Sequence, residues 1–149
     1  MQQNELNKKA IEILKSNIYM TLATTDGGLP WAAPVFYCLD EDFNFYFISQ
    51  MDSLHTVHIL KQPKVAFAVF DSHQAEGSGN GVQGTGMVHL LEGVEIVEGL
   101  KHYSTTFIEM KPEILASPAP YRLFKLETDS FFVLDPEAPT DKRVKVVVR

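Results

Sequence analysis

Cysteine is nearly missing from this sequence: Cys38 is the only one among 149 residues. A single cysteine cannot form an intrachain disulfide, which is typical of proteins from a reducing compartment. Cys38 lies in a run of aromatic and aliphatic residues with no basic partner beside it. We therefore expect a small buried side chain rather than a nucleophile.

Long apolar runs are also missing. No stretch of 18 apolar residues occurs, and the polar segment 1–9 is not followed by an apolar run. The sequence therefore predicts no membrane-spanning helix and no signal peptide, and we expect a cytoplasmic protein.

Basic charge is scarce, since 13 Lys and Arg stand against 19 Asp and Glu, a net charge of −6. Non-specific binding of nucleic acid needs a basic surface, so nucleic acid is not an expected partner. The length suits one domain over residues 1–149 and is too short for a TIM barrel or for a Rossmann dehydrogenase with a separate substrate domain.

Hydrophobic spacing predicts one amphipathic helix over residues 4–16, capped by Asn4, and further helices over 53–61 and 95–110. Between them the pattern changes to alternation with many β-branched and aromatic residues, which favours strands. The expected strands cover residues 18–25, 31–39, 43–49, 64–71, 82–92, 121–128, 131–134 and 143–149.

Connections between consecutive strands are mostly short, which predicts an antiparallel sheet closing into a barrel. Segment 64–71 is apolar almost throughout, so we expect it to be buried on both faces. The glycine-rich residues 72–81 predict a loop.

Two sequence motifs resemble known functional sites but are not assigned to one. Residues 79–84 match G-x-G-x-x-G, but a strand rather than a helix follows, so no dinucleotide site is expected. His55 and His58 are spaced i, i+3 on the short helix, yet no third ligand is evident, so no zinc site is assigned. We expect His58, His73 and His102 at the surface or in loops. His89 is expected to be a hydrogen-bonded barrel residue.

The junction at residues 45–57 is more informative, because a strand runs into a helix that begins near Ser53. The first N–H groups of a helix lack partners and carry partial positive charge, which suits an anion. Ser53 can donate to such an anion, and so can His55 in the first turn. A plain serine N-cap explains the same residues, and both interpretations remain open here.

Five segments occur in an order that resembles the pyridoxamine 5′-phosphate oxidase-like family of FMN-binding split β-barrels, in particular its small members. These segments are Thr21–Thr25, Pro30–Val35, Phe45–Ser49, Ser53–Val65 and Gly81–Gly86. The resemblance covers about residues 15–92. It implies a mainly β fold, a six-stranded antiparallel Greek-key split barrel with peripheral helices, and a homodimer with FMN between the subunits.

The resemblance also implies a cofactor site. Ser53 and His55 would hold the phosphate, and Gln83 would reach the flavin from the partner subunit. Ser49, Gln50 and Gln83 would hydrogen-bond the ring or the ribityl chain. The complete implied set of cofactor-binding residues is Ala33, Pro34, Val35, Ile48, Ser49, Gln50, Ser53, Leu54, His55 and Gln83. Trp31 either covers the ring or packs in the core or at an interface.

The function implied is that of an FMN-dependent oxidoreductase acting between a small-molecule electron donor and an acceptor, with no catalytic acid or base assigned. His55 stands where a Lys or Arg is common in the family, so a weaker or pH-dependent phosphate site is expected. The chain lacks a clear Arg-x-His near its C-terminus, which speaks against oxidation of pyridoxamine phosphate.

Other functions remain open. The chain could store flavin without turnover, or form a structural dimer without a cofactor. The same barrel could bind a deazaflavin, or haem with His55, His58 or His89 as the axial ligand.

Overall fold

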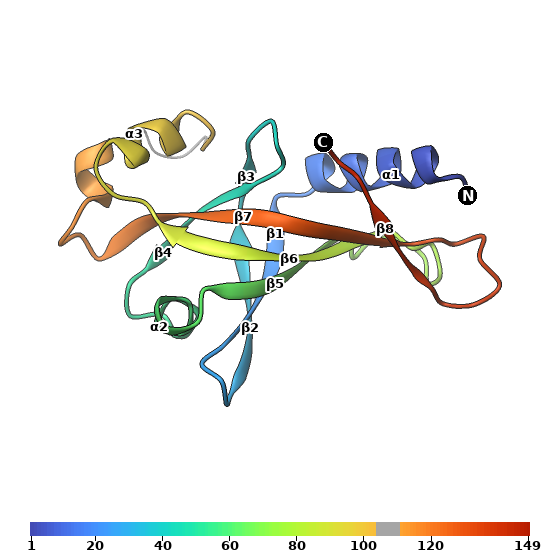
Figure 1. Ribbon diagram of the computed structural model, residues 1–149, viewed down its shortest axis with the longest axis horizontal. Helices are drawn as coiled ribbons and strands as arrows, with labels where there is room; N and C mark the ends of the chain where they lie inside the picture. Colours follow the sequence, from blue (N-terminus) through green and yellow to red (C-terminus); the bar gives the residue numbers. More distant parts are fainter. Residues whose placement is uncertain (104–110) are drawn as a thin grey trace.

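A computed structural model describes residues 1–103 and 111–149 of the chain (Figure 1). The helices are α1 (Gln3–Ser16), α2 (Leu54–Lys61), α3 (Val94–Leu100) and the 3-10 helix η1 (Pro112–Leu115). The strands are β1 (Tyr19–Thr25), β2 (Pro30–Phe36), β3 (Cys38–Leu39), β4 (Phe45–Gln50), β5 (Lys64–Phe70), β6 (Gly81–Leu90), β7 (Tyr121–Leu134) and β8 (Arg143–Val146).

One curled antiparallel sheet contains every strand of the described chain, in the order β2-β1-β5-β6-β7-β4-β3, with β8 also paired to β7. The two ends of this order, β2 and β3, are separated in the chain only by Tyr37, whose N–H donates to Ile18 O at 2.9 Å. The sheet therefore bends back toward itself as a half-barrel. This confirms the expected mainly β split barrel, with eight strands in place of six.

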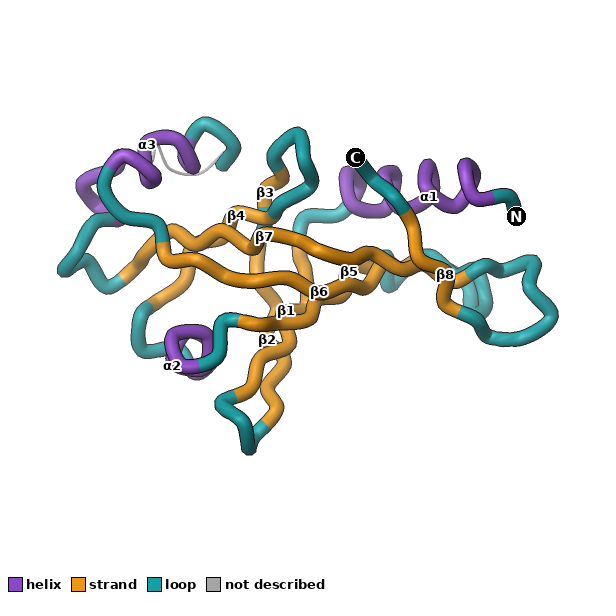
Figure 2. The backbone as a smooth tube through the Cα atoms, in the orientation of Figure 1, coloured by secondary structure: helices purple, strands orange, loops and turns teal. Residues whose placement is uncertain are grey.

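Helices lie at the periphery of the sheet (Figure 2). Helix α1 packs its buried face, which includes Leu6 and Leu14, against the core, and Tyr37 donates to Leu14 O at 2.6 Å. This helix begins with a capping box formed by Gln2 and Glu5, so the expected cap at Asn4 is wrong. Within the described residues, no helix is long and apolar enough to cross a membrane.

Aromatic rings fill the inside of the curl. The ring of Phe45 lies 4.8 Å, between centroids, from those of both Tyr37 and Phe67. Phe47 stacks on Phe124 at 5.3 Å. A second apolar cluster lies under α3 and η1 and consists of Tyr46, Leu91, Ile96, Leu115 and Leu123. The aromatic residues of segment 36–47 thus serve mainly as core.

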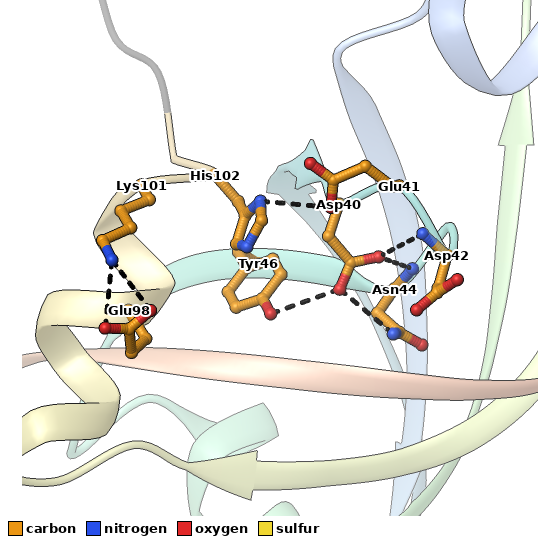
Figure 3. A network of polar contacts seen from close by, with 8 residues as sticks. All are labelled: Asp40, Glu41, Asp42, Asn44, Tyr46, Glu98, Lys101 and His102. Atoms are coloured by element: carbon orange, nitrogen blue, oxygen red, sulfur yellow. Dashed lines mark hydrogen bonds and ion pairs between the residues drawn. The ribbon is translucent and has the colours of Figure 1, made fainter.

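The β3–β4 turn joins the strands that the sequence predicted over 31–39 and 43–49, but Tyr37 divides the first into β2 and β3 and the second begins only at Phe45. Asp40 accepts hydrogen bonds from the backbone N–H groups of Asp42 and Asn44 and from the Tyr46 hydroxyl (Figure 3). Partial burial raises the pKa of Asp40, but these hydrogen bonds outweigh it and hold the pKa below its usual value. His102 stacks on the Tyr46 ring at 5.2 Å and joins this turn to the residues after α3.

Three further expectations need correction. Strand β5 is not buried on both faces: Val65, Phe67 and Val69 point inward, whereas Ala66 and Phe70 are exposed on the outer face. The strands expected over 121–128 and 131–134 form the single strand β7, with the pairing irregular beside Asp129. The helix expected over 95–110 ends at Leu100, and residues 104–110 lie outside the described residues.

Close packing near the bulge in β7 leaves no room for a side chain at Gly84. A Cβ atom there would overlap the carbonyl oxygen of Ser130 and the ring of Phe67. A Cβ atom at Gly81, on the same strand, would lie 3.4 Å from the Cβ atom of Phe70, which is ordinary contact.

We expect Gly84→Ala to lower the free energy of unfolding by about 1–3 kcal/mol, as overpacking does. Gly81→Ala should change it by less than about 0.5 kcal/mol. Urea denaturation of both variants checks this, and equal effects would contradict the assigned packing of β6 on β7.

Candidate functional site

The junction between β4 and α2 is built by backbone hydrogen bonds. Met51 N–H donates to Pro120 O at 2.9 Å and extends the pairing of β4 with β7 by one residue. Ser53 then adopts an extended conformation and its N–H donates to Gln50 O at 3.2 Å. The chain thereby turns from the strand end directly into the first turn of α2.

The Ser53 side chain does not cap this helix. Its hydroxyl donates to Gln50 O at 2.8 Å, and no side chain accepts from the first N–H groups of α2 in the described chain. Ser53 occupies the N-cap position, as one alternative predicted, but its side chain makes no capping hydrogen bond. The first turn keeps N–H donors and the positive end of its dipole for another acceptor.

A cluster of hydroxyls surrounds the imidazole of His55. Nε2 of His55 lies 2.8 Å from Ser49 Oγ and 3.4 Å from Ser53 Oγ. Ser53 Oγ also lies 2.8 Å from the hydroxyl of the fully buried Thr56. We call Ser49, Ser53, His55 and Thr56 the junction cluster. It gathers hydrogen-bonding groups and one ionisable side chain at the uncapped end of α2.

Burial lowers the pKa of His55 below its ordinary value of 6.5. The imidazole is therefore neutral at neutral pH in the ligand-free chain. A neutral imidazole still donates one hydrogen bond, so the junction cluster offers donors to an anion without a fixed positive charge.

Helix α2 is fastened to the barrel by a second histidine. His58, expected at the surface, is 1% exposed. Its Nδ1 lies 3.0 Å from Thr24 Oγ1 on β1, and its Nε2 lies 4.0 Å from Asp26 Oδ2. The expectation failed because it took no account of α2 lying against β1, which buries this face of a short helix.

The other implied cofactor residues split between the two faces of the sheet. Ala33 and Val35 point into the core, whereas Pro34 between them is exposed. Ile48 is half-buried, and Gln50 and Leu54 are exposed beside the junction cluster. The structure therefore brings Ser49, Gln50, Ser53, Leu54 and His55 together, and leaves the side chains of Ala33 and Val35 in the core.

Gln83 lies elsewhere, on the outer face of the sheet. It lines a groove of about 360 Å³ over β1, β5 and β6. Paired positions across the strands form one row, Pro34, Thr21, Ala68, Gln83 and Phe132. The adjacent row is Ala32, Ala23, Ala66, Thr85 and Ser130. Small side chains thus make the floor of this groove.

Gln83 and the junction cluster lie at different positions along β7. Ser49 is paired with Arg122, and Gln83 with Phe132, ten positions further along the same strand. Gln83 therefore does not belong to the junction cluster of its own chain.

Sequence reasoning missed Thr56 and Arg122. Thr56 follows Ser53 at i+3, so helical spacing could have placed both on one face. Arg122 is buried opposite Ser49, where its Nε donates to Leu115 O at 2.8 Å. No local signal marks this arginine, because its surroundings depend on pairing between β4 and β7, far apart in the chain.

The remaining candidates do not form a site. His89 is exposed, with its Nε2 3.5 Å from Glu127, and it is not enclosed in the barrel. Cys38 is half-buried and Trp31 is 45% exposed. Residues 1–103 and 111–149 contain no group of three His, Cys, Asp or Glu side chains arranged to hold a metal. The G-x-G-x-x-G segment runs into β6, as expected.

The fold and the junction together define a split-barrel protein in which a strand runs directly into a helix whose first turn has no side-chain cap hydrogen bond. A family model described as pyridoxamine 5′-phosphate oxidase matches residues 6–135. The chain therefore belongs to the pyridoxamine 5′-phosphate oxidase family, as the resemblance predicted.

Individual relatives are more distant. The UPF0306 protein PM1958 of Pasteurella multocida is 28% identical over 103 residues, 68% of this chain and 69% of that protein. A haem-binding protein of Mycobacterium smegmatis has a TM-score of 0.72 at 17% identity and covers 94% of this chain. This chain spans 57% of that protein's length.

An FAD-binding protein of Mesorhizobium loti has a TM-score of 0.63 at 15% identity. The match covers 88% of this chain and 92% of that protein. At such identities the likeness to both solved structures concerns the fold.

The lowered pKa of His55 predicts a pH effect on stability. The folded chain binds a proton here less readily than the unfolded chain, so acidification through 6.5 favours unfolding. The parent chain should lose more stability between pH 7 and pH 5 than His55→Gln does.

Urea denaturation at several pH values measures this difference. His73→Gln, at a side chain that is 93% exposed, is the matched control and should lose as much stability as the parent. Identical pH profiles for the parent and His55→Gln would refute the role of His55.

Proposed function

We propose that this chain binds FMN and acts as an FMN-dependent oxidoreductase, with the phosphate at the junction cluster. The observation that carries the proposal is the uncapped first turn of α2, with Ser53 and His55 beside it. Free helix N–H groups and an imidazole are donors that suit a phosphate, and the Ser53 hydroxyl would become a third by turning from Gln50 O toward the anion. Membership of the pyridoxamine 5′-phosphate oxidase family makes a flavin phosphate the anion of choice.

The chain's own part is binding and orientation. Ser53, His55 and the first N–H groups of α2 would hold the phosphate, and Ile48 and Gln50 lie next to them at the end of β4. Bound flavin supplies hydride and electron transfer between a small-molecule donor and an acceptor. No acid or base of this chain is assigned to that transfer.

We further propose a homodimer that completes the site. Gln83 lies in the outer groove over β1, β5 and β6 and is not part of the junction cluster of its own chain. A twofold partner that packs its outer face here can supply its own Gln83 instead. The two rows of small side chains in the groove favour close packing of one sheet on another.

A second candidate ligand is haem, which a protein of similar fold is named for binding. Haem needs an axial ligand, and Nδ1 of His55 has no partner among the described residues, whereas both ring nitrogens of His58 face partners. A Soret band that disappears in His55→Ala would support haem over flavin.

The visible spectrum of the purified chain, after incubation with FMN and desalting, is the first test. Flavin bands near one equivalent per chain are expected, and their absence would overturn the FMN assignment. The bands also distinguish flavin from a deazaflavin. Bound flavin that stays oxidised under anaerobic NADH and NADPH would favour storage of flavin over turnover.

The double variant Ser53→Ala/His55→Ala tests the phosphate site. Two lost hydrogen bonds to a charged group should weaken FMN binding by about 10- to 100-fold. Riboflavin, which has no phosphate, should bind equally to both proteins. The control Ser16→Ala/His73→Ala changes the same residue types at exposed positions and should bind FMN like the parent. Unchanged FMN affinity in the first variant contradicts the site.

Ala68→Arg tests the dimer, since it places a charge on the groove floor opposite Gln83. Light scattering should then give the monomer mass of 16.8 kDa, and FMN retention should fall although the junction cluster is intact. Thr140→Arg, at an exposed loop position, should remain dimeric. A parent chain that is monomeric at micromolar concentration, or an Ala68→Arg monomer with full FMN affinity, would refute the proposal.

A further inference from the structure

The hydroxyl of Ser49 has one hydrogen-bonding partner. Its Oγ lies 2.8 Å from Nε2 of His55, and Ser49 is 6% exposed. The Ser49 hydroxyl makes no other hydrogen bond within the described chain. A hydroxyl this buried is more stable when its proton is hydrogen-bonded, because a buried donor without an acceptor costs free energy.

Counting protons across this contact selects one arrangement. If Nε2 of His55 carried the proton and donated to Ser49, the hydroxyl proton of Ser49 would have no acceptor. If Ser49 donates to an unprotonated Nε2, every buried donor at the contact is used. The hydroxyl of Ser53 does not compete, because its proton goes to Gln50 O.

A neutral imidazole with an unprotonated Nε2 carries its proton on Nδ1. Nδ1 of His55 has no partner in the part of the chain that is described, and no buried side-chain nitrogen or oxygen there lacks one. Nδ1 is therefore accessible to solvent. The proton of His55 is consequently presented outward at the start of α2, where an anion would approach.

We propose that Ser49 is a positioning residue that holds His55 in its neutral Nδ1–H form, so that His55 donates to a phosphate without being protonated. This inference rests on the proposed FMN site. It replaces the contact of Ser49 with the ring or ribityl chain that the family resemblance implied. His55 stands where a Lys or Arg is common in the family. The proposal predicts that this difference does not make phosphate binding pH-dependent above neutrality.

No neighbouring charge disturbs this arrangement. Asp52 lies on the same turn, Lys61 at the far end of α2, Asp26 beside His58 on the β1 side, and Arg122 on β7 opposite Ser49. Burial alone shifts the pKa of His55, and none of these groups contributes.

The same helix provides an internal comparison. His58 is held in the opposite sense, with Nδ1 facing the hydroxyl of Thr24 and Nε2 facing the carboxylate of Asp26. Thr24 is 4% exposed and its hydroxyl has no other acceptor in the described chain, so the same count of protons has Thr24 donate to Nδ1 and places the ring proton on Nε2. Two histidines three positions apart should therefore show opposite tautomers.

Nitrogen-15 NMR of the imidazoles in the ligand-free chain at pH 8 tests the assignment directly. His55 should carry its proton on Nδ1 and His58 on Nε2. Ser49→Ala should move His55 toward the Nε2–H form and leave His58 unchanged, and Thr128→Val, which removes a buried hydroxyl on β7, should leave both histidines unchanged. A His55 of the parent chain protonated on Nε2 overturns the proposal, whether or not FMN binds.

Binding supplies the second test, with the ratio of FMN to riboflavin affinity as the readout. Between pH 7 and pH 9 at least about nine-tenths of the phosphate is doubly ionised, so the parent ratio should stay within about twofold. A site that needs imidazolium would lose about tenfold per pH unit in this range. Such a loss would overturn the proposal, whereas no FMN binding at all would overturn only the proposed function.

Ser49→Ala should lower the ratio about five- to tenfold, and Ser49→Thr, which keeps a hydroxyl, should restore most of it. Thr128→Val should keep the parent ratio and so controls for loss of a buried hydroxyl elsewhere in the sheet. An unchanged ratio in a folded Ser49→Ala chain would contradict the positioning role.

Discussion

Pairing along β7 is the constraint on which the rest of the structure depends. This one strand pairs with β6, β4 and β8, so it joins both halves of the curled sheet. Its first residues align Ser49 of β4 beside the start of α2, and its later residues align Gln83 of β6 in the outer groove. The bulge at Asp129 lets one strand serve both neighbours, and Gly84 and Gly86 provide the space that this close approach requires.

Helix α2 is held by polar contacts as well as by apolar packing. Its buried residues are Thr56, His58 and Ile59, and two of these three are hydrogen-bonded to Ser53 and Thr24. A buried hydrogen bond fixes direction, whereas apolar contact fixes only proximity. The first turn of α2 therefore points from the end of β4 in a defined orientation, which is what an anion site needs.

The sequence predicted much of this in outline. Alternation of apolar residues identified most strands, and the ordered segments from Thr21 to Gly86 identified the family. The order of residues 49–55 also placed Ser49, Ser53 and His55 close together, because they lie on one continuous turn. The prediction of burial failed for Ala66 and Phe70, since an apolar run does not reveal that one face of β5 is left open. It failed for His58, whose burial depends on contact with Thr24 on another strand.

The sequence by itself determined the local elements, the family and the residues at the start of α2, because these depend on neighbours along the chain. Only the tertiary structure decided which faces are covered, that Arg122 lies opposite Ser49, and that Gln83 lies in the outer groove. It also placed the hydroxyl of Ser49 2.8 Å from Nε2 of His55. These features depend on strand register, and register is set by pairing between residues far apart in the chain.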